Sequence, residues 1–99
     1  MNIKQHKPIH PGEFIRRVYI DPFGLKITHV SEALGVSPST LSRLIQGKSD
    51  IVPKMALRLS KVLGRSPESW LLMQDNYDLE RAKREIDLSK CEPINFATA

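Results

Sequence analysis

Cysteine is nearly absent from this sequence of 99 residues, since Cys91 is the only one. A single thiol excludes an intrachain disulfide and a metal site built from cysteines. No apolar run approaches the roughly 18 residues of a membrane-spanning helix, and nothing resembles a secretory signal peptide. We therefore expect a protein of the cytoplasm with no membrane partner.

The sequence also lacks the common catalytic motifs. His6, His10 and His29 do not have the spacing of metal ligands, and no HExxH motif occurs. There is neither a GxSxG motif nor a phosphate-binding loop. Cys91 has no candidate base near it in sequence. These absences predict that the chain is not an enzyme and needs no metal or cofactor.

No stretch of four or more residues alternates between apolar and polar side chains as a half-buried strand does, which predicts an all-α fold. Glycine and proline divide the chain into five helical segments, one opening near Pro11 and others at about 28–34, 38–46, 53–63 and 67–86. We expect residues 1–9 to be a flexible arm and residues 89–99 a disordered tail. Residues 10–88 are then a single domain, as the length allows.

The ends of the helices have recognisable signals. Thr28 is the expected N-cap of the second helix, and Gly35 supplies the left-handed residue that ends it. Ser37 is the expected N-cap of the third helix, with Pro38 at its first position. Ser66 and Pro67 repeat that start before the fifth helix.

Positive charge dominates the first two thirds of the chain, and the net charge is +4. Residues 51–65 contain four bases and no acid, whereas residues 66–99 contain seven acids and four bases. This balance is compatible with a polyanionic partner, and it is equally compatible with solvated helix faces. Charge alone leaves both interpretations open.

The third helix lies in the sequence "GVSPSTLSRLIQGK", residues 35–48, which contains no acid. Helical spacing puts Leu41 and Leu44 on one face and small polar residues around Arg43 on the other. Hydroxyl groups can meet phosphates or base edges, and an arginine matches the edge of guanine in the major groove. Two short helices joined through Gly35 also match a helix-turn-helix unit. DNA binding is therefore favoured over a helical module that only binds protein.

At the level of motifs, residues 10–83 resemble the HigA-type antitoxins, which belong to the Xre/Cro-like helix-turn-helix group. The motifs that carry the resemblance are "HPGE", "LGVSPSTLSRLIQGK", "MALRLSKVLG" and "SPESWLLMQDNYDL". The resemblance implies a compact, five-helix, lambda-repressor-like domain with a long C-terminal helix. It also implies a homodimer that binds an operator, represses its own operon and restrains a HigB-type toxin, an mRNA endoribonuclease. A stand-alone transcriptional regulator without a toxin is the alternative.

The resemblance places the DNA contacts at the start of the second helix and along the third. The positions in this sequence are Thr28, His29, Ser37, Ser39, Thr40 and Arg43. Ser31, His29 and Pro38 depart from the usual pattern of the group, so the bases that are read are not specified. Lys48 is a further candidate for a phosphate contact or a plain loop cation.

The fifth helix has more apolar residues than one buried stripe needs, which suggests a surface for a second copy. Trp70 and Tyr77 belong either to the core or to this interface. We predict an interface that contains Trp70, Leu71, Leu72, Tyr77 and Leu79.

Overall fold

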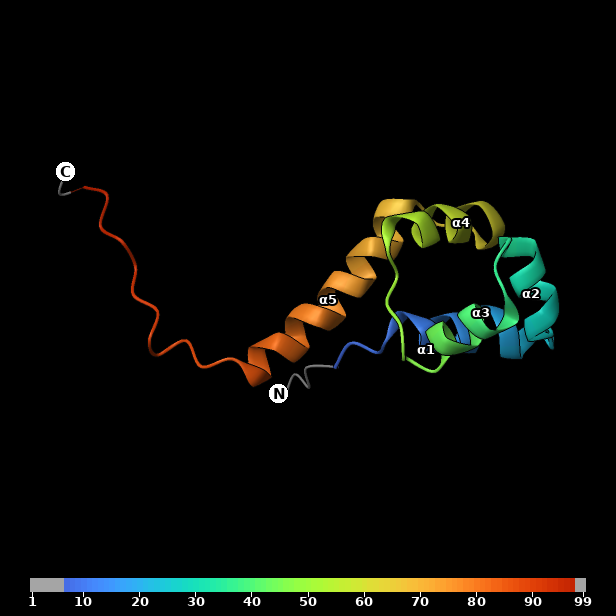
Figure 1. The fold of residues 1–99 in the computed structure, drawn as a ribbon, viewed down its shortest axis with the longest axis horizontal. Helices are drawn as coiled ribbons and strands as arrows, with labels where there is room; N and C mark the ends of the chain where they lie inside the picture. Colours follow the sequence, from blue (N-terminus) through green and yellow to red (C-terminus); the bar gives the residue numbers. More distant parts are fainter. Residues whose placement is uncertain (1–6, 98–99) are drawn as a thin grey trace, which may run out of the picture.

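The computed structural model describes residues 7–97, which contain five α-helices and no strand. In chain order they are α1 (Pro11–Ile15), α2 (Ile27–Leu34), α3 (Pro38–Ile45), α4 (Pro53–Leu63) and α5 (Pro67–Glu85). Helices α1 to α4 and the start of α5 form a globular part, from which the rest of α5 projects (Figure 1). The all-α prediction, with a long C-terminal helix, is confirmed.

The first helical segment is less regular than its sequence pattern indicates. Helix α1 continues into the π-helical turn η1 (Arg16–Ile20) and the 3₁₀ turn η2 (Asp21–Phe23). Pro22 has no backbone N–H to donate and so cannot continue an α-helical hydrogen-bond pattern. Gly24, at φ 60°, then turns the chain toward α2.

The helix starts agree with the sequence at two of three predicted caps. The backbone N–H of Thr40 donates to Ser37 Oγ, and that of Ser69 donates to Ser66 Oγ, so both serine caps are confirmed. The cap predicted at Thr28 is wrong, because α2 begins earlier, with Lys26 in the N-cap position. Gly35 has φ 73° and ends α2 as predicted.

The core lies where α1 to α4 and the start of α5 meet, and Trp70 is its largest buried side chain. Trp70 has no exposed surface, and its indole Nε1–H donates to the carbonyl of Gly64 at 2.9 Å. The core side chains are Ile15, Ile20, Val30, Leu34, Leu41, Leu44, Ile51, Met55, Ala56, Leu59 and Trp70.

Helices α1 and α3 approach each other closely at Gly12. A Cβ atom on Gly12 would lie only 1.7 Å from the backbone carbonyl oxygen of Leu44, so any larger residue would push the two helices apart. The glycine of "HPGE" therefore has a packing reason, and it brings the N-terminus of α1 against the C-terminal end of α3.

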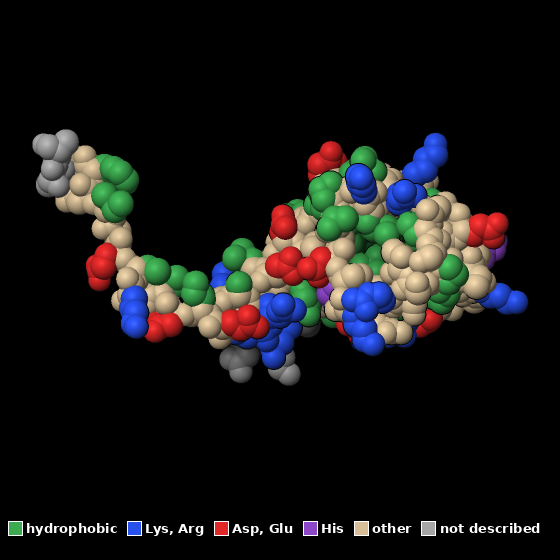
Figure 2. Space-filling model, in the orientation of Figure 1, with side chains coloured by type: hydrophobic (Ala, Val, Ile, Leu, Met, Phe, Trp, Pro, Cys, Tyr) green, Lys and Arg blue, Asp and Glu red, His purple; other side chains and the backbone are tan. Residues whose placement is uncertain are grey.

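Residues 86–97 follow α5 without forming a helix or strand, and hydrophobic side chains are exposed along them (Figure 2). In this segment, a hydrogen bond from the Ser89 side chain, with a second from its backbone N–H, lowers the pKa of Asp87. Residues 1–6 of the predicted arm lie outside the described residues, and the predicted disorder of residues 89–99 stays a prediction. No helix within residues 7–97 is long and apolar enough to cross a membrane.

Candidate nucleic-acid interface

Helix α3 is anchored on one side only. Leu41 and Leu44 are completely or almost completely buried, whereas Ser39, Thr40 and Arg43 are exposed on the opposite side. The predicted division of this helix into a core face and a polar face is thus confirmed. The exposed face combines short hydroxyl side chains with one guanidinium group, so another surface can come close to its backbone.

Three hydroxyl groups gather at the exposed N-terminus of α3. Ser37 Oγ lies 2.8 Å from Thr40 Oγ1 and 3.2 Å from Ser39 Oγ, and it also accepts the backbone N–H of Thr40 at 3.1 Å. Ser37 therefore caps the helix and is exposed at the same time. Free N–H groups and the helix dipole make this end favourable for a phosphate oxygen.

The start of α2 contributes a second group of exposed polar residues. Thr28 and His29 lie in its first turn, and both are exposed. Lys26, which is not among the contacts predicted from the sequence, is exposed at the N-cap position just before them. Nearby, Ser31 is buried and its hydroxyl donates to the carbonyl of Thr28, which leaves room for α2 and α3 to cross closely.

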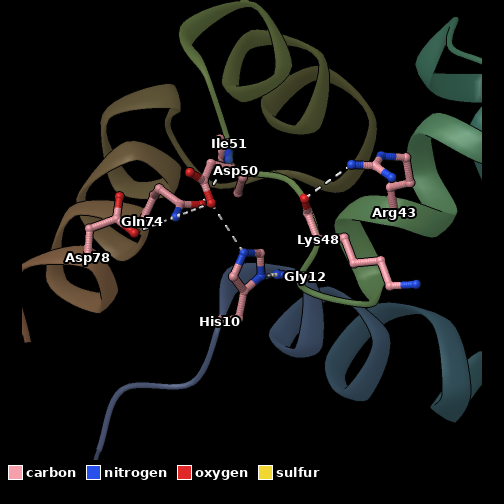
Figure 3. Close-up of polar contacts among 8 residues, drawn as sticks. All are labelled: His10, Gly12, Arg43, Lys48, Asp50, Ile51, Gln74 and Asp78. Carbon is pink, nitrogen blue, oxygen red and sulfur yellow. Dashed lines mark hydrogen bonds and ion pairs between the residues drawn. The ribbon is translucent and has the colours of Figure 1, made fainter. Parts of the chain in front are cut away.

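The other end of α3 carries Arg43 and Lys48. Arg43 Nη2 donates to the backbone carbonyl of Lys48 at 3.4 Å, a long contact that leaves the guanidinium group exposed (Figure 3). The Lys48 side chain is exposed too, in the loop that follows Gly47. Two cations therefore lie together at the C-terminal end of α3.

Several other bases are already engaged within the protein. Arg58 donates to the carbonyls of Leu34 and Gly35, at 2.8 and 3.2 Å, and so supports the turn between α2 and α3. Arg65 lies over the rings of Phe14 and Trp70, at 5.3 and 5.6 Å from their centroids. Two of the four bases in residues 51–65, Arg58 and Arg65, therefore have structural roles. Their contacts could not be predicted from the local sequence pattern.

The exposed face of α5 carries an apolar stripe with a spacing of seven residues. Leu72 and Leu79 are more than half exposed, and Ile86, at the C-cap, continues the stripe. Leu71 is half-buried, and the half-buried Tyr77 ring packs edge-on against His10. A hydrogen bond with the Tyr77 side chain, followed by the charge of Glu85, raises the pKa of Arg81 at the edge of this face.

One residue of the predicted dimer interface needs correction. Trp70 has no exposed surface and contacts Phe14 and Tyr19, with ring centroids 6.0 Å away in both cases. It therefore belongs to the core of the protomer and offers no surface to a second copy. The prediction stays open for Leu71, Leu72, Tyr77 and Leu79.

Comparison with known proteins gives one family match and many similar structures. A helix-turn-helix family model matches residues 15–70. The chain is 36% identical over 80 residues to YddM of Escherichia coli K12, an uncharacterized HTH-type transcriptional regulator, covering 81% of this chain and 84% of that protein. It is 34% identical over 79 residues to antitoxin HigA-1 of Vibrio cholerae, covering 80% and 74%.

Among solved structures, the fold is similar to that of antitoxin GraA in complex with its operator. The TM-score is 0.78 at 32% sequence identity, and the alignment covers 95% of this chain and 100% of GraA. The similarity therefore extends beyond the helix-turn-helix unit to the long C-terminal helix.

Proposed function

Since this chain belongs to the helix-turn-helix family, with HigA antitoxins among its relatives, we propose that it is a DNA-binding antitoxin that represses its own operon. The observation that carries the proposal is the acid-free outer face of α3, exposed above the buried Leu41 and Leu44. The likeness to an antitoxin bound to its operator supports it.

The exposed residues divide into two roles. Ser39, in the first turn of α3, and Arg43, in its last turn, are exposed and are the candidates for reading base edges. Ser37 and Thr40 at the helix N-terminus, together with Thr28 and His29 on α2, are candidates for phosphate contacts that set the position of the helix. Lys26 and Lys48 extend this set at the two ends of the surface.

Replacing Arg43 by alanine tests the base-reading role. Operator affinity should fall by about 5- to 150-fold per half-site, the range for one bidentate contact to a base. The binding of an unrelated duplex should change by only a few-fold, because it loses one charge contact. Fluorescence anisotropy with a duplex from the region upstream of the encoding gene measures both.

Arg84→Ala is the matched control, because it removes the same charge from the exposed last turn of α5. It should leave operator affinity nearly unchanged. If Arg43→Ala lowers the affinity for operator and for unrelated DNA equally, Arg43 makes only a charge contact and does not read a base.

The proposed DNA-binding form is a homodimer that pairs through the stripe of Leu72, Leu79 and Ile86. A spacing of seven residues keeps these side chains on one side of α5, as in helices that pair along their length. Two copies can then present their α3 helices about 34 Å apart, one turn of DNA.

Lysine at both Leu72 and Leu79 should raise the dimer dissociation constant by at least about tenfold, because each protomer would bury two unpaired ammonium groups. Sedimentation equilibrium measures this constant, and circular dichroism checks the helical content. Leu57→Lys is the control, since Leu57 is equally exposed but lies on α4. If the double variant dimerises normally, the interface lies elsewhere.

The finer part of the proposal is that the chain neutralises a HigB-type toxin, an mRNA endoribonuclease. Its relatives named as antitoxins support this role, whereas YddM, named as a transcriptional regulator, supports a second candidate without a toxin. Co-expression with the protein of the adjacent reading frame separates the two. A stable complex that suppresses mRNA cleavage supports the antitoxin, and DNA binding with no such complex supports the stand-alone regulator.

A further inference from the structure

Two of the motifs in the sequence meet at one residue of the loop that leaves α3. His10 opens "HPGE" at the start of α1, and Gln74 belongs to "SPESWLLMQDNYDL" on α5. Both side chains face Asp50, which lies two residues after Lys48 (Figure 3). The proposed DNA contacts use neither motif directly.

Gln74 connects α5 to this loop through hydrogen bonds that fix the orientation of its side-chain amide. Its Oε1 accepts the backbone N–H of Ile51 at 2.8 Å, and its Nε2 donates to Asp50 Oδ1 at 3.2 Å and Asp78 Oδ1 at 3.0 Å. Gln74 is only 3% exposed. A flipped amide would put a donor against the Ile51 N–H and an oxygen beside two carboxylates. The loop is therefore held at two consecutive residues.

His10 completes the surroundings of Asp50 from the side of α1. Its Nδ1 accepts the backbone N–H of Gly12 at 2.9 Å, so the proton of the neutral ring lies on Nε2. Nε2 is buried, has no hydrogen-bond partner within residues 7–97, and lies 3.6 Å from Asp50 Oδ1. Asp50 thus lies between His10 at the start of α1 and Gln74 on α5.

We call the hydrogen bonds of Gln74 with Asp50 and Ile51 the clamp. The clamp keeps the Asp50 carboxylate away from the Lys48 side chain. Figure 3 shows Asp50 pointing toward Gln74 and His10, whereas the Lys48 side chain points the other way. The Asp50 side chain is 64% exposed, and its carboxylate would repel DNA if it turned to the side of Lys48. Because Asp50 and Ile51 are both bonded to Gln74, the loop has little freedom to rotate Lys48 away from the side of α3.

We propose that Asp50 and Gln74 are positioning residues for a phosphate contact of Lys48, an inference that rests on the proposed DNA binding. They touch no DNA themselves. They hold the loop so that the ammonium group of Lys48 stays beside α3, where Arg43 already contacts the Lys48 carbonyl.

The test compares Asp50→Ala with Asp78→Ala. Each variant removes one negative charge and one acceptor from the same Gln74 amide nitrogen, but only Asp50 belongs to the loop. Simple electrostatics predicts that Asp50→Ala strengthens DNA binding. The clamp predicts the opposite, a loss of about tenfold in operator affinity per half-site, the size of one lost charged contact. Asp78→Ala should stay within about twofold of the wild type.

Two further readouts distinguish positioning from a general loss of stability. In a Lys48→Ala background, Asp50→Ala should have much less effect, because the contact it positions is gone. Lys48→Ala keeps the backbone carbonyl that Arg43 contacts. The double-mutant cycle of Asp50→Ala and Lys48→Ala therefore reports on the Lys48 side chain alone. In the free protein, amide hydrogen exchange at Ile51 should be faster in Asp50→Ala than in Asp78→Ala, with similar thermal unfolding of both.

Unchanged or tighter operator binding by Asp50→Ala overturns the inference, and so do additive effects in the cycle. Failure of the proposed function looks different, because the wild-type protein would then bind no operator even in low salt. The hydrogen-exchange comparison needs no DNA, and equal exchange at Ile51 in the two variants would by itself refute the clamp.

Discussion

Raising the salt concentration from about 50 to about 200 mM should weaken operator binding by ~10³-fold, the lower end of the range for a dimer that contacts 6–10 phosphates. We expect the lower end because many bases are already engaged. Arg16 and Arg17 pair with Asp21 and Glu13, and Arg58 supports the turn after α2. Lys26, Arg43 and Lys48 remain exposed on the proposed surface, which makes about six cationic groups that would displace counterions from DNA in a dimer.

Anisotropy titrations at five salt concentrations measure the slope of log affinity against log salt. Lys48→Ala in both protomers should lower the slope by about two, since each lost phosphate contact contributes about 0.9. Asp50→Ala should produce a similar change if it acts through Lys48. A steep decrease in affinity separates DNA binding from a helix-turn-helix that only binds protein. A slope near zero would contradict the proposed surface.

Much of this surface could be predicted because its structural signals are local. Ser37 and Pro38 start α3, and the three- and four-residue spacing of Leu41, Leu44 and Ile45 decides which side faces the core. The same logic gave the cap at Ser66. The cap predicted at Thr28 was wrong because α2 begins without a side-chain cap, so its start has no local signal.

The remaining features depend on residues that lie far apart in the sequence. Arg58 reaches carbonyls 23 and 24 residues away, and Gln74 reaches Asp50 across 24 residues. No periodicity in the sequence predicts such hydrogen bonds. The same limit explains Trp70, since an apolar residue on a long helix can face its own core or a second copy. Only the positions of Phe14 and Tyr19 decide between them.

Replacing Trp70 by alanine should lower the free energy of unfolding by about 3–5 kcal/mol, as for other fully buried large aromatic residues. The indole fills the space between Phe14, Tyr19 and Arg65, and alanine would leave a cavity there. The Gly64 carbonyl would also lose its donor. This loss is a large share of the stability of a small domain, and urea unfolding followed by circular dichroism measures it.

Two comparisons make the result specific. Trp70→Phe keeps an aromatic ring but loses the Nε1–H, so its loss should be clearly smaller than that of alanine. Leu57→Ala, at an exposed position on α4 outside the proposed dimer interface, should cost no more than about 0.5 kcal/mol. Because Trp70 lies inside the protomer, the loss for Trp70→Ala should not depend on protein concentration. If the loss of unfolding free energy disappears on dilution, Trp70 belongs to the dimer interface, because only contacts between subunits depend on protein concentration.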